Sequence, residues 1–98
     1  MNMAMNLTSQ DFIELNNIPN GTTIFQFSPF CNHCAVVRPV LEKLKAQGHK
    51  VILLSSDNVT LDDLEYVPTA VCVGNDERQV GVGNFKRFVK ECERKNGK

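Results

Sequence analysis

Two of the four cysteines in this 98-residue chain stand close enough to act together. Cys31 and Cys34 enclose Asn32-His33, and they follow a β-branched, aromatic run that is typical of a strand. Helical spacing of apolar residues begins at Cys34, so Cys31 should lie at a helix N-terminus, where free amides and the helix dipole favour a thiolate. We expect Cys31 to attack disulfides, and the more buried Cys34 to resolve the resulting mixed disulfide.

Zinc binding is the main competing interpretation of this motif. A structural zinc site needs two more ligands at matched spacing, and the chain has no second Cys-x-x-Cys. His33 lies inside the motif, and His49 follows the helix and should point elsewhere. A purely structural disulfide is a weaker alternative. Redox chemistry is therefore favoured, and we expect the two remaining cysteines, Cys72 and Cys92, to be inert apolar side chains of the core.

The surrounding pattern predicts elements that position this motif. Buried strands are expected at 22–27, 50–55 and 69–73, with 77–82 returning as a hairpin strand and a further short strand at 4–7. Helices are expected to start near Thr8, to run from Cys34 to a cap at Gly48 with Pro39 inside, to form one or two turns at 60–66, and to run on from Asn84. Strands that alternate with helices pair in parallel, and the hairpin adds an antiparallel pair. We predict one α/β domain, 1–98, with a mixed sheet of four to five strands and helices on both faces.

Composition excludes several classes of function. Eleven basic and eleven acidic residues give a formal charge of zero, which argues against nucleic-acid or membrane-surface binding by bulk electrostatics. No apolar run approaches the roughly 20 residues that cross a bilayer. The first ten residues do not resemble a secretory signal, so we expect a cytoplasmic monomer. The basic residues near the C-terminus are expected to form a solvated helix face and tail: Lys86, Arg87, Lys90, Arg94, Lys95 and Lys98.

Taken together, these residues resemble the thioredoxin superfamily over nearly the whole chain. The segment 30–34 is similar to its aromatic-Cys-x-x-Cys site, Pro39 to its helix proline, and 67–69 to the segment that holds its cis proline. Gly81 and Gly83 fall where the family places glycine beside the substrate groove. The resemblance implies a thioredoxin fold and a protein-disulfide oxidoreductase with no bound metal or organic cofactor. Its electrons would come from thioredoxin reductase and NADPH or from glutathione, and its partners would be disulfide-containing proteins. The groove would be formed by Pro29, Phe30, Val67, Pro68 and Gly83.

The chain departs from thioredoxins around the two cysteines. Asn32-His33 replaces their Gly-Pro, and a His before the second cysteine resembles disulfide isomerases and periplasmic oxidases. We expect both residues to tune the site, with the imidazolium stabilising the Cys31 thiolate and so the reduced form. Phe25 stands in place of the family's buried Asp, and Leu53 in place of the Lys that faces it. Water or Glu42 would then have to take the proton of Cys34.

The segment from Asp57 to Pro68 is shorter than in thioredoxins, and the run from Pro68 to Asn84 is closer to the compact glutaredoxin layout. Glutathione-binding features are incomplete, because no basic residue closely precedes Cys31, and the paired-Gly-then-Asp element is replaced by 81–84, Gly-Val-Gly-Asn. A glutathione-dependent oxidoreductase is therefore the alternative function. A zinc-binding or scaffold protein without turnover is a less favoured one.

Overall fold

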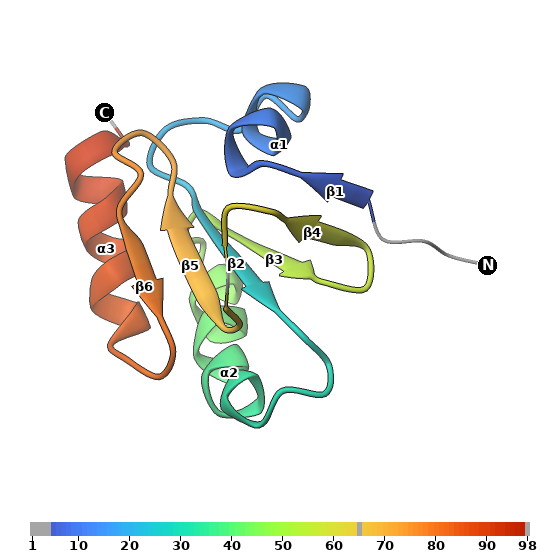
Figure 1. Ribbon diagram of the computed structural model, residues 1–98. Coiled ribbons are helices and arrows are strands. Elements are labelled where there is room, and N and C mark those ends of the chain that lie inside the picture. Colours follow the sequence, from blue (N-terminus) through green and yellow to red (C-terminus); the bar gives the residue numbers. More distant parts are fainter. Residues whose placement is uncertain (1–4, 65, 98) are drawn as a thin grey trace.

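The computed structural model describes residues 5–64 and 66–97 and contains the alternating elements that the sequence predicts (Figure 1). In chain order they are β1 (Met5–Leu7), α1 (Ser9–Leu15), β2 (Thr23–Phe27), α2 (Asn32–Ala46), β3 (Val51–Ser55), β4 (Val59–Leu61), β5 (Thr69–Cys72), β6 (Arg78–Val80) and α3 (Phe85–Asn96). The short strand predicted at 4–7 is confirmed as β1, apart from Ala4, which lies outside the described residues.

The main sheet has the strand order β3-β2-β5-β6. β2 pairs in parallel with β3 and antiparallel with β5, and β5 pairs antiparallel with β6. Successive side chains of a strand point to opposite faces. Phe25 and Phe27 accordingly pack with α2 and α3, whereas Ile24 packs with α1 and β4. The predicted mixed sheet with helices on both faces is confirmed.

β4 corrects the prediction of a helical turn at 60–66. Val59–Leu61 pairs in parallel with β1 as a separate two-stranded sheet, and turns follow it. The buried side chain of Gln26 in β2 joins this small sheet to the main one. Its Nε2 donates to the Val59 carbonyl at 2.7 Å, and its Oε1 accepts from the Leu61 amide at 3.3 Å. Leu61 is itself fully buried, so long-range contacts outweigh the weak local pattern of this acidic segment.

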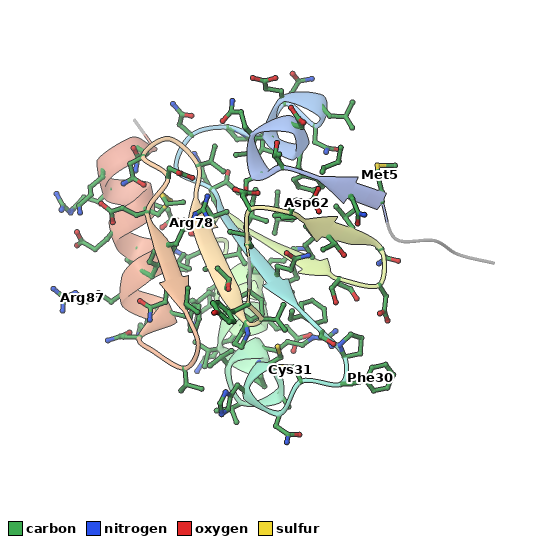
Figure 2. All side chains as sticks on the ribbon, in the orientation of Figure 1. Met5, Phe30, Cys31, Asp62, Arg78 and Arg87 are labelled. Carbon is green, nitrogen blue, oxygen red and sulfur yellow. A yellow bond between two sulfur atoms is a disulfide. The ribbon has the colours of Figure 1, made fainter. Side chains whose placement is uncertain are left out.

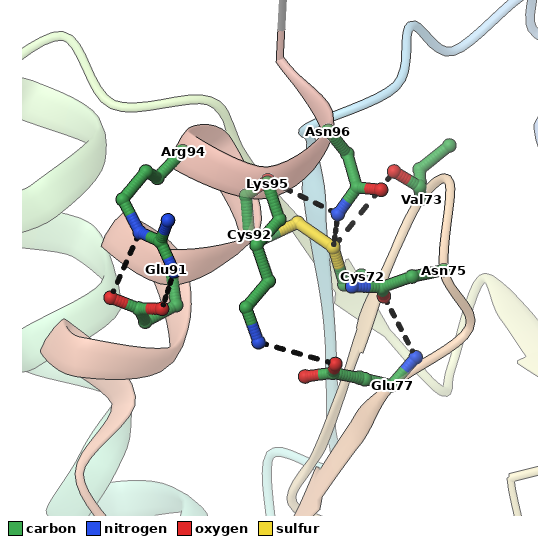
Figure 3. Close-up of polar contacts among 9 residues, drawn as sticks. All are labelled: Cys72, Val73, Asn75, Glu77, Glu91, Cys92, Arg94, Lys95 and Asn96. Carbon is green, nitrogen blue, oxygen red and sulfur yellow. Dashed lines mark hydrogen bonds and ion pairs between the residues drawn. A yellow bond between two sulfur atoms is a disulfide. The ribbon is translucent and has the colours of Figure 1, made fainter.

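The prediction that Cys72 and Cys92 are inert apolar side chains is wrong, because the two form a disulfide. Cys72 ends β5 and Cys92 lies on the buried face of α3, so their Cα atoms come within 5.7 Å across a separation of 20 residues. The Asn96 side-chain amide donates to the Cys72 sulfur and to the Cys92 carbonyl, both at 3.3 Å (Figure 3). Because Cys72 pairs with Thr23, the first residue of β2, this bond lies at the opposite end of that strand from Cys31.

Replacing this disulfide should destabilise the fold without touching the other cysteine pair. For Cys72→Ala/Cys92→Ala we expect the free energy of unfolding to fall by about 3 kcal/mol, because the closed loop restricts the unfolded chain. Urea denaturation followed by circular dichroism measures it. Cys31→Ser/Cys34→Ser is the matched control and should change stability much less. Equal effects of the two double variants would contradict this prediction.

Gln26→Leu should also destabilise the protein, by about 1–3 kcal/mol, because the Val59 carbonyl and the Leu61 amide then lack partners. Hydrogen exchange of the Leu61 amide should accelerate more than exchange of amides within β5. A variant as stable as the parent, with unchanged exchange at Leu61, would show that the side-chain bridge contributes little.

Candidate active site

Cys31 is the N-cap residue of α2, with extended backbone angles, φ −93° and ψ 121°. Its Sγ accepts a hydrogen bond from the Cys34 amide at 3.2 Å, and its side chain is partly exposed. The first amides of a helix lack partners within the helix and carry its positive dipole end. This arrangement places the Cys31 sulfur at the positive end of α2, where it is partly exposed to solvent.

Cys34 lies one turn further along α2 and is 1% exposed, which confirms the prediction that it is the more buried of the two. Its Sγ accepts a hydrogen bond from the Ser28 amide at 3.5 Å. Burial raises the pKa of the Cys34 thiol to about 11, and the hydrogen bond and charge of Cys31 add to the effect. Cys34 therefore stays protonated at neutral pH. It also lies deeper than Cys31, whose side chain is partly exposed.

The Val67–Pro68 peptide bond is cis, as the resemblance implied. It places the Val67 carbonyl oxygen 3.6 Å from the Cys31 Sγ, which donates to it. The Pro68 carbonyl accepts from the Gly81 amide at 2.9 Å, so the start of β5 and the connection before α3 lie at the same edge as Cys31. Figure 1 shows these segments gathered at the lower end of the molecule, beside the first turn of α2.

Exposed apolar side chains surround this edge. Pro29 is exposed, and the ring of Phe30 is 89% exposed and points away from the molecule in Figure 2. Gly83 is exposed in the connection that leads to α3. Sequence reasoning missed three further exposed apolar residues: Tyr66, Val80 and Val82. The only sequence signal for them was their position next to Val67 or Gly81, which were already expected beside the groove.

Asn32 and His33 are exposed on the first turn of α2. Within residues 5–64 and 66–97, neither side chain forms a hydrogen bond or ion pair. Their role in tuning the cysteines stays a prediction, which the position of the imidazole in the turn between the two sulfurs continues to motivate.

Phe25 and Leu53 face each other across β2 and β3, as the resemblance led us to expect for the positions of the missing Asp–Lys pair. Phe25 is fully buried, with its ring edge-on to Phe85 at 5.5 Å. Glu42 does not replace the missing carboxylate, because it lies about 12 Å further along the helix than Cys34 and pairs with Arg38 at 3.5 Å. Water as the acceptor of the Cys34 proton stays a prediction.

Neither a metal centre nor a membrane span emerges from the part of the chain that the structure describes. No three His, Cys, Asp or Glu side chains gather there as a metal site, so the zinc alternative gains no support. No helix in the same residues is long and apolar enough to cross a bilayer.

Several solved structures are similar to this chain. The reduced thioredoxin pre-protein of Schistosoma mansoni superposes with a TM-score of 0.65 at 13% identity, covering 90% of this chain and 93% of that one. Fasciola hepatica thioredoxin superposes with a TM-score of 0.61 at 20% identity, covering 92% of this chain and 99% of that one. Malassezia sympodialis thioredoxin superposes with a TM-score of 0.59 at 17% identity, covering 94% of this chain and 92% of that one. No protein-family model and no curated protein sequence matches the chain. The structural likeness shows that it has the thioredoxin fold.

The two cysteines should differ sharply in reactivity. With iodoacetamide at neutral pH we expect Cys31 to be alkylated first. Cys34 should react only as the pH rises towards 11, because its thiolate fraction grows about tenfold per pH unit below its pKa. Mass spectrometry of the two peptides measures both rates, and Cys31→Ser isolates the rate of Cys34. Equal rates at neutral pH would contradict the assignment of roles.

Proposed function

We propose that this chain is a thiol-disulfide oxidoreductase that reduces or exchanges protein disulfides. The observation that carries the proposal is the Cys31 sulfur, held at the α2 N-terminus by the Cys34 amide and beside the Val67 carbonyl. A nucleophilic sulfur on the surface and a protonated one directly beneath it are the parts that two-step thiol–disulfide exchange requires.

The reaction transfers two electrons from the cysteine pair to the substrate. The Cys31 thiolate attacks one sulfur of the substrate disulfide, forming a mixed disulfide and expelling the other substrate sulfur as a thiolate, which takes a proton from solvent. Cys34 then loses its proton to water and attacks the Cys31 sulfur. The Cys31–Cys34 bond forms, the mixed disulfide breaks, and the second substrate thiol leaves. The electrons reside in the sulfurs, so the cycle requires no bound metal or organic cofactor.

The rim of exposed apolar residues supports protein disulfides as the substrates. Pro29 and Phe30 lie on one side of Cys31, and Val67 and Pro68 on the other. Gly83 belongs to the connection that Gly81 ties to Pro68. An extended substrate segment can contact such a surface through its backbone and apolar side chains, as in strand addition.

Insulin reduction in the presence of dithiothreitol tests the proposed activity. The protein should accelerate precipitation of the reduced insulin B chain, and Cys31→Ser should abolish the acceleration, because the attacking sulfur is lost. Cys34→Ser should accumulate mixed disulfides on Cys31, visible as a mass shift. Cys72→Ala/Cys92→Ala is the control and should remain active below its melting temperature. An active Cys31→Ser variant would overturn the proposal.

The electron donor separates the thioredoxin-like proposal from its glutathione-dependent alternative. We propose that oxidised protein is reduced faster by thioredoxin reductase with NADPH than by glutathione. NADPH oxidation measures the first reaction, and trapping of free thiols measures the second. Preference for glutathione would favour the glutaredoxin-like function.

A monomer in the cytoplasm remains our proposal for its state and location. Disulfides are rare in the cytoplasm because cellular thiols keep cysteines reduced. The oxidation state of Cys72 and Cys92 in protein from acid-quenched cells therefore bears directly on this location.

A further inference from the structure

The chain is neutral overall, but its charges are separated along the sequence. α3 carries five basic residues and two acidic ones, whereas the segment 57–77 carries six acidic residues and no Lys or Arg. The two regions meet at the C-terminal half of α3, where Lys95 pairs with Glu77. In the first half of α3, Arg87 points into solvent, away from Asp62 in the turn after β4 (Figure 2). Neutrality therefore does not mean a surface without local fields.

The basic helix begins at the edge that holds the cysteines. Cys31 contacts Val67, the Pro68 carbonyl accepts from Gly81, and α3 starts four residues later at Phe85. The buried Phe85 ring packs on Phe25 and fixes the start of the helix against the core. The first turn of α3 is thus tied to the active-site edge.

The cations of α3 fall into two groups. In its second half, Arg94 pairs with Glu91 at 2.7 Å and Lys95 with Glu77 at 3.5 Å (Figure 3). In its first half, Lys86, Arg87 and Lys90 are exposed, and none of them forms an ion pair with another described residue. The uncompensated positive charge therefore lies in the half of α3 nearer to Cys31.

These three cations border a shallow hollow of about 300 Å³, together with Asn84 and Glu91. Glu91 brings one negative charge to it. Hydrogen bonds from Arg94 hold the pKa of Glu91 below its usual value, with smaller contributions from Lys95 and Arg87, so this carboxylate is already engaged. The hollow retains a net positive charge.

We propose that Lys86, Arg87 and Lys90 form a docking surface for protein substrates that carry acidic residues beside their reactive disulfide. The inference rests on the proposed oxidoreductase function and assigns it a substrate class. The cations attract acidic residues during the encounter and hold them on the flank of the site while Cys31 attacks. Such attraction acts mainly on the association rate and weakens with salt.

Two synthetic peptides with one internal disulfide test this surface. They are identical except that the residues flanking the cysteines are Glu in one and Gln in the other. At about 10 mM salt, where charges interact over about 30 Å, we expect the reduced protein to reduce the Glu peptide about fivefold faster; at about 1 M salt the ratio should approach one.

Lys86→Glu/Arg87→Glu should abolish or reverse the preference. Lys43→Glu/Lys45→Glu is the matched control: it changes the charge equally, at the end of α2 remote from Cys31, and should retain the preference. Lys86→Gln/Arg87→Gln guards against a folding defect and should lose the preference at unchanged melting temperature. If the parent protein reduces both peptides equally, or if the Lys86/Arg87 variants retain the preference, the docking surface is wrong. If it reduces neither peptide, the proposed function itself fails.

Discussion

The hydrogen bond from the Cys34 amide to the Cys31 sulfur is the interaction on which the site depends. Helices usually begin at a residue whose oxygen accepts from the first turn, whereas here a sulfur does so. The same sulfur donates to the Val67 carbonyl at 3.6 Å, so the start of α2 and the cis peptide together fix where it lies. The residue that begins α2 therefore also carries the sulfur that we propose to react.

The position of that cap is set by β2, which is paired on both sides and ends just before the cysteines. Phe25 and Phe27 hold β2 against α2 and α3, and Gln26 joins it to β4 on the other face. At the far end of the sheet the Cys72–Cys92 bond fastens α3 to β5. Burial distinguishes Cys31 from the disulfide, because Cys72 and Cys92 are 2% and 3% exposed, whereas Cys31 is partly exposed. In the proposed function, exchange with substrates proceeds at the Cys31 end of the sheet, while the buried Cys72–Cys92 bond is shielded from thiols.

Local sequence patterns predicted most of the fold and the two cysteines at the centre of the site. Apolar periodicity located the strands and the three helices, and the spacing of Cys31 and Cys34 at a strand–helix junction located the nucleophile. β4 was missed because it is three residues long and is stabilised by partners distant in sequence, the backbone of β1 and the side chain of Gln26. The Cys72–Cys92 bond was missed because it depends on where α3 crosses β5. A periodic pattern of apolar residues does not specify the distance between Cys72 and Cys92, so it could not predict this bond.

Within residues 5–64 and 66–97 no carboxylate forms a hydrogen bond with Cys34, which raises the question of how this thiol ionises in the proposed exchange. Three effects raise its pKa: burial, the hydrogen bond with Cys31, and the charge of Cys31. When Cys31 enters a mixed disulfide it no longer carries a charge, and its sulfur becomes a poorer hydrogen-bond partner. Two of the three effects then weaken together, while the hydrogen bond from the Ser28 amide, which favours the thiolate, stays in place. For the proposed exchange we therefore expect the pKa of Cys34 to fall at the step that requires its thiolate. Water as the proton acceptor in that step stays a prediction.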